Sequence, residues 1–150
     1  MPTKKSPKLP ARLERQIGLQ LRLAQLSVFA DIVDQLKALD LRPVDMTALM
    51  LIDAKPGLRQ HVIGDHLKIA RPNVAALIGA LQTRGLVERL VDDEDRRASQ
   101  LRLSEAGQAL LAQAREIETA HMRRVHEALD GVDIDNFLKG LQQLAHMTHK

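Results

Sequence analysis

The feature that most constrains this chain is a change in the spacing of its apolar residues near residue 86. Before that point, apolar residues recur every three or four positions, which is the spacing of an amphipathic helix. The clearest such run is Val74, Leu77, Ile78 and Leu81. From Leu86 to Leu103 they alternate with polar residues, and helical spacing returns after Ser104, a good helix N-cap. The sequence therefore predicts a small β-hairpin within a helical protein.

The order of the elements before this hairpin indicates a winged helix-turn-helix. Helical spacing predicts helices over residues 43–54, 59–67 and 71–84. Gly85 follows the last of them and suits the left-handed backbone conformation that often ends a helix. The hairpin follows at once. In a winged helix-turn-helix, the second of two helices joined by a tight connection enters the major groove of duplex DNA.

The predicted helices that flank this lobe carry more apolar surface than a small domain can bury. The first of them has two apolar rows. One row is Leu13, Ile17, Leu21, Ala24, Val28, Ile32 and Leu36, and the other is Leu19, Leu23, Leu26, Ala30 and Val33. A helix with two apolar faces must bury both. We expect one face to meet its own lobe and the other a second copy, although burial in a single larger core would also satisfy the pattern.

The residue types that the chain lacks exclude several kinds of site. Its 150 residues include no Cys, Trp or Tyr and only two Phe. Without Cys there is no disulfide framework, no Cys-ligated metal and no thiol redox sensor. RNA-binding sheets and single-strand-binding barrels stack bases on aromatic rings, which are nearly absent here. We therefore expect an aliphatic, mainly helical core.

The positive charge is concentrated at the N-terminus. The formal net charge is +3, and the first fifteen residues contribute five Lys or Arg against one Glu. Residues 1–10 are expected to be a basic, disordered tail that either stays solvated or reaches nucleic acid or a partner. Residues 11–150 are expected to form a single domain. Since no apolar targeting segment or membrane span is predicted, we expect a cytoplasmic protein.

The outward face of the helix over residues 71–84 is poor in charge and in bulk. It carries Arg71, Pro72, Asn73, Ala75, Ala76, Gly79 and Ala80. Small side chains let a helix approach base edges closely, and Arg71 and Asn73 near its start can contact bases or phosphate. A solvated surface helix would carry Glu and Lys here, so we favour a DNA-contacting face over an ordinary exposed one.

Three short motifs stand in order after this helix. They are Gly85-Leu86-Val87-Glu88-Arg89, Asp95-Arg96-Arg97 and Leu103-Ser104-Glu105-Ala106-Gly107. Each is weak alone, but with this order and spacing the chain resembles the MarR (multiple antibiotic resistance regulator) family of dimeric winged-helix transcription factors. The resemblance covers residues 12–148. It implies a mainly α fold with a small β-hairpin wing, in which a winged helix-turn-helix lobe (43–103) is flanked by dimerisation helices (11–40 and 105–150).

The resemblance implies DNA-binding roles for residues of the wing. Arg97 matches the family's wing arginine, which enters the minor groove, and Asp95 matches the acid that orients it. A narrow minor groove is electronegative, so a fixed guanidinium gains energy there without reading a full base code. Arg96 and Arg102 are then expected to contact phosphates.

The helix-turn-helix partly departs from the family's pattern. Gln60 matches the start of the first helix of the motif, which commonly touches the DNA backbone. Arg59 stands where the family usually has a Thr N-cap, and it could add a phosphate contact. Recognition-helix positions that often hold Ser, Thr or Arg are here Pro72, Asn73, Ala75 and Ala76. Ala can contact a thymine methyl group but has no donor that could bind guanine. This departure therefore changes the operator sequence that we expect, but not the way in which the helix docks on DNA.

The resemblance also implies a homodimer on double-stranded, palindromic operator DNA that a small molecule releases. Members of the family often bind aromatic carboxylates, phenols or related anions between the DNA-binding lobe and the dimerisation helices. Arg22, Met46 and Met50 are candidates for such a cleft, where Arg22 would meet a carboxylate unless it is simply a solvated arginine. The expected function is a ligand-responsive repressor without a cofactor, whose effector is an aromatic or phenolic carboxylate or its thioester.

Three other functions can be compared with a ligand-responsive repressor. A zinc sensor on the same fold would use His121 with His126 or His146 with His149. The first pair is five residues apart, which is poor for one helix face, and the second is three apart but lies at a terminus that is expected to fray. No enzyme is expected, because the chain has neither a nucleophile elbow nor a phosphate-binding glycine loop. A helical dimer that only binds proteins would not explain the arginines of the wing.

Overall fold

The structure, a computed structural model, describes residues 10–91 and 99–147. Its helices are α1 (Ala11–Glu14), α2 (Ile17–Leu36), the 3₁₀ helix η1 (Lys37–Leu39), α3 (Pro43–Ala54), α4 (Gln60–Leu67), α5 (Arg71–Thr83), α6 (Glu105–Ala128) and α7 (Ile134–Ala145). Its strands are β1 (Leu58–Arg59), β2 (Val87–Val91) and β3 (Ser99–Leu103), in the antiparallel order β1-β3-β2. The predicted fold class, mainly helical with a small β wing, is confirmed.

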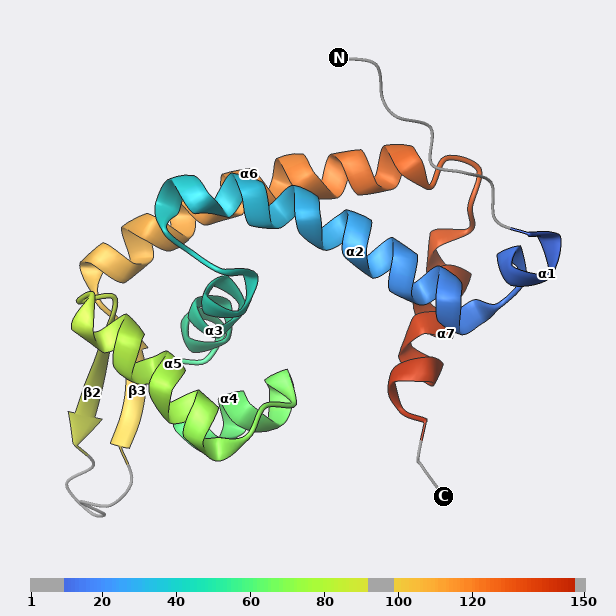
Figure 1. The fold of residues 1–150 in the computed structure, drawn as a ribbon. Helices are drawn as coiled ribbons and strands as arrows, with labels where there is room; N and C mark the ends of the chain where they lie inside the picture. Colours follow the sequence, from blue (N-terminus) through green and yellow to red (C-terminus); the bar gives the residue numbers. More distant parts are fainter. Residues whose placement is uncertain (1–9, 92–98, 148–150) are drawn as a thin grey trace.

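Two long helices connect two groups of shorter elements (Figure 1). The C-terminal part of α2 lies beside α6, and the two helices pack on each other. Helices α3, α4 and α5 form a lobe with the sheet at the end where α2 finishes and α6 begins. Helices α1 and α7 lie at the opposite end, beside the start of α2. The described helices include none with the length and apolar character needed to cross a membrane.

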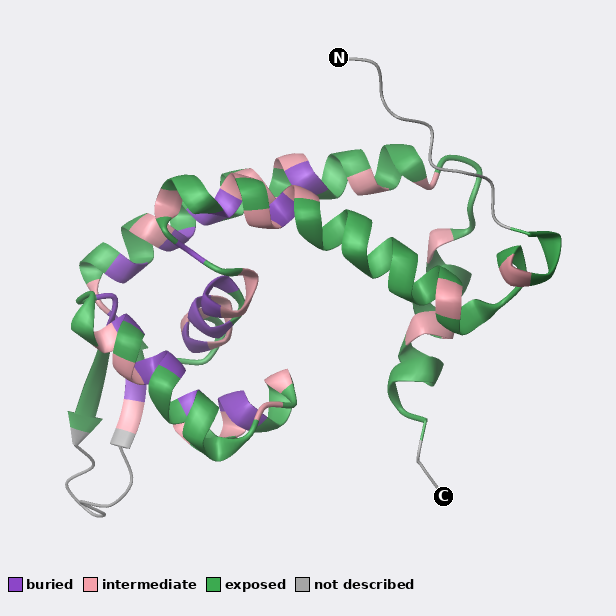
Figure 2. Ribbon diagram, viewed as in Figure 1, coloured by how far each residue is buried: buried purple, intermediate pink, exposed green. Residues whose placement is uncertain are grey.

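The hydrophobic core lies inside this lobe and where α2 and α6 join it (Figure 2). Its most deeply buried side chains are Leu36, Leu49, Ile52, Ile63, Val74, Ile78, Leu81, Leu101 and Leu111. All of them are aliphatic, as the composition predicts. The four apolar residues expected to face inward from α5 are all buried. This packing holds α5 on the lobe while its other side stays exposed.

Helices α4 and α5 meet at a close approach that only a small residue permits. A Cβ atom at Gly64 would lie 2.8 Å from Val74 Cγ2, which is closer than side chains tolerate. Lys68 ends α4 in the left-handed conformation, with φ 55°. The short connection to Arg71 then starts α5 across α4, which forms the predicted helix-turn-helix.

The register of the hairpin decides which side chains face the helices. Val87 pairs with Leu103, and Glu88 pairs with Arg102. Val87 and Leu103 are buried. Since alternate residues of a strand point to opposite faces, Arg89 shares the helix-facing side with Val87, while Glu88 and Arg102 lie on the other side.

Two parts of the backbone differ from the prediction. The apolar rows between Leu13 and Leu36 predict one helix, but α1 and α2 are separated because Gln16 takes an extended conformation that no Pro or Gly marks. The sequence also predicts a helix from residue 59. Instead Leu58 and Arg59 form β1, paired with Leu101 and Gln100. A strand of two residues is too short to show alternation in the sequence.

Helix α6 begins in direct contact with the lobe. Ser104 is its N-cap residue, and Ser104 Oγ accepts a hydrogen bond from the Gly107 N–H at 3.0 Å. The Ser104 hydroxyl donates to the Gly85 carbonyl at 2.5 Å, and the Ser104 N–H donates to the Leu86 carbonyl at 3.1 Å. A Cβ atom at Gly107 would overlap the Leu86 carbonyl oxygen. These contacts fix the start of α6 to the connection between α5 and β2.

A polar cluster joins α2 to α6 beyond the core. Asp31 Oδ2 accepts a hydrogen bond from Arg124 Nη2 at 2.8 Å and lies 2.6 Å from His121 Nδ1. The hydrogen bonds from Arg124 and His121 lower the pKa of Asp31 from its usual value, against a smaller opposing effect of desolvation. His121 is buried, so its ring forms part of the packing between these two helices.

Asp45, in the first turn of α3, reaches back to the N-cap residue Arg42. Its Oδ2 accepts the Arg42 backbone N–H at 2.8 Å, and its Oδ1 lies 2.7 Å from Arg42 Nη2. Burial of the Asp45 carboxyl acts to raise its pKa. The hydrogen bonds from Arg42 and the charges of Arg42 and Arg84 outweigh this and lower the pKa below its usual value. The fold therefore stabilises the charged carboxylate.

Replacing Gly107 should destabilise the junction between the lobe and α6. Gly107→Ala forces the Leu86 backbone and α6 apart and should lower the free energy of unfolding by about 1–3 kcal/mol. Gly79→Ala is the matched control, because nothing lies within 4 Å of a Cβ atom there. It should raise the helix stability by about 0.5–1 kcal/mol. Urea denaturation followed by circular dichroism measures both, and an unchanged midpoint for Gly107→Ala would contradict the close approach.

The low pKa of Asp45 predicts a pH-dependent contribution to stability. Because the folded-state pKa is lowered, the contribution is complete above the usual value of 3.8 and is lost as the pH falls through the folded-state pKa. Asp45→Asn should therefore cost about 1–2 kcal/mol at pH 7 and progressively less below about pH 4. Asp65→Asn on the exposed side of α4 is the control. A cost for Asp45→Asn that stays constant down to pH 2.5 would exclude this origin.

Candidate nucleic-acid interface

The exposed side of α5 carries the small residues that the sequence predicts for it. Its exposed residues include Arg71, Pro72, Asn73, Ala75, Ala76 and Ala80. With short side chains on this side, the helix backbone can come close to base edges in a major groove. The N-cap residue Ala70 offers no side-chain acceptor to the first turn. That end of α5 is therefore suited to a phosphate oxygen.

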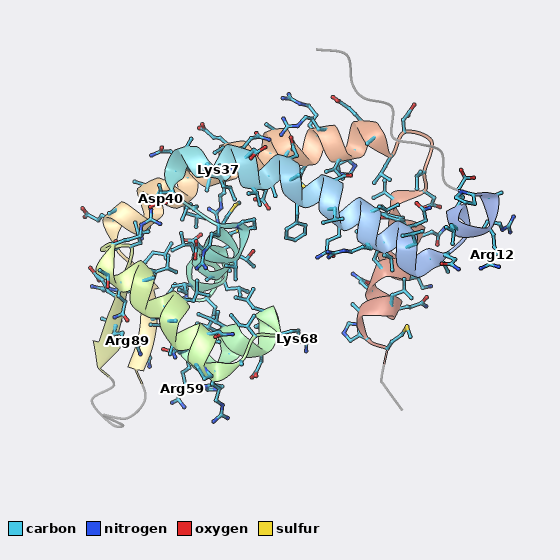
Figure 3. All side chains as sticks on the ribbon, viewed as in Figure 1. Arg12, Lys37, Asp40, Arg59, Lys68 and Arg89 are labelled. Carbon is cyan, nitrogen blue, oxygen red and sulfur yellow. The ribbon has the colours of Figure 1, made fainter. Side chains whose placement is uncertain are left out.

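The start of α4 adds a second element beside α5. Arg59 is the exposed N-cap residue of α4, and Figure 3 shows it at the outer side of the lobe, away from α2. Gln60 is the first residue of α4 and is partly buried. The contacts with the DNA backbone that the sequence predicts for these two residues stay a prediction.

Arg89 connects the hairpin to both helices of the helix-turn-helix. Its Nη2 donates to Gln60 Oε1 at 2.6 Å, and its Nε donates to Gln82 Oε1, on α5, at 2.9 Å. Figure 3 shows Arg89 on the hairpin. The sequence-based site did not include this residue. The sequence feature that could have identified Arg89 is the alternation along β2, which puts Arg89 on the same face as the buried Val87.

Arg102 lies on the opposite face of the sheet and has a partner within the chain. Its Nε is 2.7 Å from Glu88 Oε2, and the two side chains are 52% and 46% exposed. Exposed ion pairs of this kind contribute little to stability, so a phosphate group could compete with Glu88 for Arg102. Its expected phosphate contact stays a prediction.

The wing-tip residues Asp95, Arg96 and Arg97 lie outside the described residues. The two strands that lead to them are paired up to Val91 and Ser99. The roles assigned to the three residues therefore stay predictions. The same holds for the basic tail expected over residues 1–10, of which only Pro10 is described.

A cleft of about 890 Å³ separates α5 from the junction of α2 and α3. Apolar residues line it, among them Val33, Leu41, Val44, Leu77 and Leu81. The charged residues that line it are Lys37, Arg42 and Arg84 together with Asp40 and Asp45. Asn73 and Ala76 also line this cleft, although they belong to the predicted DNA-contacting face. A molecule bound here would thus lie against the recognition helix.

The three residues suggested for a ligand occupy different environments. Met46 is buried in the core, and Met50 is partly buried against it. Arg22 is exposed on α2. None of the three lines the cleft beside α5. Their part in binding a ligand stays a prediction.

The candidate zinc ligands do not gather into a site in the described part of the chain. No group of three or more His, Asp or Glu side chains there could hold a metal ion. His121 is paired with Asp31, and His146 Nδ1 lies 2.7 Å from the Gln142 carbonyl oxygen. His126 is exposed on α6, and His149 lies outside the described residues.

Comparison with known proteins gives matches over nearly the whole chain. The transcriptional repressor CouR bound to a 23-mer DNA duplex is 36% identical, with a TM-score of 0.85 over 94% of this chain and 100% of that one. CouR bound to p-coumaroyl-CoA is 34% identical, with a TM-score of 0.81 over 95% of this chain and 100% of that one. CouR from Rhodococcus jostii RHA1 shares the fold at 24% identity, with a TM-score of 0.81 over 94% and 99% of the two chains.

A family model agrees with these structures. The model of the MarR family matches residues 39–98, which include α3, the helix-turn-helix and strand β2. No curated protein sequence matches the chain. The resemblance inferred from the three motifs is confirmed, and it identifies a regulator and not an enzyme. Taken with the exposed face of α5 and the hairpin beside it, these matches show that the chain belongs to the MarR family of DNA-binding transcriptional regulators.

Proposed function

We propose that the protein is a homodimeric, ligand-responsive repressor that binds a palindromic operator in the cytoplasm. The observation that carries this proposal is the exposed, small-residue face of α5 in a chain 36% identical to a DNA-bound repressor. Each lobe (43–103) would read one half-site. Two recognition helices about one turn of DNA apart then match a two-fold symmetric site.

Within each half-site, α5 would read bases and the other elements would fix its position. Arg71 and Asn73 reach base edges or phosphate from the first turn of α5, and Pro72, Ala75 and Ala76 allow close approach. Arg59 and Gln60 contact the DNA backbone at the start of α4. These contacts set the docking of the helix, while the few polar side chains of α5 supply direct readout.

The wing would add a minor-groove contact. Arg97 enters a narrow, electronegative minor groove, and Asp95 orients its guanidinium. Arg96 and Arg102 contact phosphates on either side. Arg102 would exchange Glu88 for a phosphate oxygen when DNA binds.

A homodimer is supported by the apolar surface at the end of the molecule remote from the lobe. Large apolar side chains exposed there include Ile17, Leu23, Leu26, Phe29, Phe137, Leu138 and Leu144. Helix α7 has no buried residue, although one of its faces is strongly apolar. Exposed apolar patches of this size mark interaction surfaces, and a second copy of the helices over 11–40 and 105–150 would cover this one.

The effector would be an aromatic acid or its thioester, as the sequence resemblance suggests. A relative that is 34% identical over 95% of this chain is described as bound to p-coumaroyl-CoA. The cleft beside α5 supports the same class of ligand, because apolar residues line it together with Lys37, Arg42 and Arg84. An aryl group would occupy its apolar part. An anionic group would pair with Lys37, whose ion pair with Asp34 is exposed, because Arg42 and Arg84 already bond within the chain. A contribution from Arg22, Met46 or Met50 stays part of this proposal.

Removing the wing arginine should weaken operator binding without unfolding the dimer. Arg97→Ala should reduce affinity for the operator by about 1–3 kcal/mol, and the slope of log affinity against log salt should fall by about one. Gel-shift titrations against DNA upstream of the gene at several salt concentrations measure both. Light scattering should still give the mass of two chains. Arg123→Ala, exposed on α6, is the control, and full affinity of Arg97→Ala would contradict the wing role.

The effector proposal predicts selective release of DNA by a thioester. p-Coumaroyl-CoA added to the protein–operator complex should dissociate it in a concentration-dependent manner. Coenzyme A alone should act weakly because it lacks the aryl group, and free p-coumarate tests whether the acid suffices. Fluorescence anisotropy of labelled operator measures all three. If none of them releases DNA, this ligand class is wrong while operator binding still stands.

A further inference from the structure

Arg84 makes a long-range connection that the proposed function does not use. It is the C-cap residue of α5, directly after the recognition helix. Its Nη1 donates to the Asp40 carbonyl at 2.6 Å, and its Nη2 donates to the Leu39 carbonyl at 3.1 Å. One guanidinium therefore joins the end of α5 to a segment more than forty residues earlier in the chain.

The two carbonyls belong to the turn that ends α2. After α2, η1 continues to Leu39, and Asp40 takes the left-handed conformation with φ 50°. The Leu41 N–H then returns to the Leu36 carbonyl at 3.1 Å. Carbonyls at the end of a helix lack intrahelical partners and carry partial negative charge. The fork of a guanidinium suits two adjacent acceptors of this kind better than the ammonium of a lysine does.

This connection joins two helices whose main packing neighbours differ. Helix α5 packs mainly on α4 and β2, whereas α2 packs on α6, η1 and α3. The cleft beside α5 lies between α5 and the end of α2, and both Arg84 and Asp40 line it. Figure 3 shows Asp40 and Lys37 at the end of α2 that faces the lobe. Arg84 thus spans the gap between the DNA-reading helix and the long helix that carries the proposed dimer surface.

We propose that Arg84 is a positioning residue that sets the placement of the recognition helix relative to α2. The inference rests on the proposed function, because the spacing of two recognition helices matters only in a dimer on a two-part operator. The core residues of α5 keep the helix folded on the lobe. The two Arg84 hydrogen bonds hold the lobe at one angle to α2, and that angle fixes the distance between the half-sites that the dimer can read.

The first test compares operators that differ only in half-site spacing. The variant is Arg84→Lys, which keeps the charge but loses the two-pronged donor. Wild type should bind the natural spacing much more tightly than a site with one base pair inserted at its centre. Arg84→Lys should reduce this ratio by about fivefold or more, while binding to a single half-site changes less than twofold. Arg123→Lys on α6 is the matched control and should leave the ratio unchanged.

The salt dependence separates positioning from direct contact. A positioning residue leaves the slope of log affinity against log salt unchanged, whereas loss of a phosphate contact lowers the slope by about one. Because lysine could keep such a contact, Arg84→Gln is measured as well. A salt slope reduced by one in Arg84→Gln, with an unchanged spacing ratio in Arg84→Lys, would overturn the proposal.

A second measurement needs no DNA and therefore does not depend on the proposed function. The chain has no Cys, so Gln25→Cys on α2 and Ala75→Cys on α5 provide the only two labelling sites. Spin labels there, with labelled chains diluted in unlabelled protein, report the α2–α5 distance distribution by electron–electron double resonance. Arg84→Lys should broaden or shift the distribution relative to the wild-type background. An unchanged distribution in a variant with wild-type circular dichroism would overturn the tether even if operator binding is normal. A broadened distribution, together with no operator binding by the unlabelled chain that keeps Gln25 and Ala75, would instead retain the tether and reject the proposed function.

Discussion

The rest of the structure depends on the contact between the first turn of α6 and the backbone at Leu86. Here Gly107 lies against the Leu86 carbonyl, and Ser104 caps α6 while bonding Gly85 and Leu86. The end of α5, the start of β2 and the start of α6 are thereby held at one place. Since the recognition helix ends and the wing begins at this junction, a few backbone contacts hold both against the start of α6, while Arg84 connects α5 to the end of α2.

Much of the lobe could be predicted from local patterns. The apolar spacing of α5 identified the residues that are buried, because a helix on a core must repeat every three to four positions. Ser104 and Gly85 marked helix ends, because N-cap geometry and a positive φ favour these residue types. The small exposed side chains of α5 followed from the same spacing. The motifs after residue 85 then identified the family.

The connections between elements could not be predicted in this way. Strand β1 exists because Leu58 and Arg59 meet β3, and nothing in two residues signals such pairing. The Arg89 link to Gln60 joins residues 29 positions apart, and Arg84 reaches 44 and 45 positions back. Such contacts depend on how whole elements are placed in three dimensions. Alternation marked the face of Arg89, but its partners required the completed fold.

The residues of α5 make the placement of this helix unusually important for specificity. The side chains of Ala75, Ala76 and Ala80 have no hydrogen-bond donors, so in the proposed complex direct readout from the helix would fall mainly to Arg71 and Asn73. With fewer base-specific bonds, discrimination between operators depends more on DNA shape and on the spacing of two half-sites. Both are read through the geometry of the protein. In the proposed complex, a polar tether such as that of Arg84 would therefore have more influence than it would beside a recognition helix rich in arginine, because strong base contacts would not compensate for a small change in helix position.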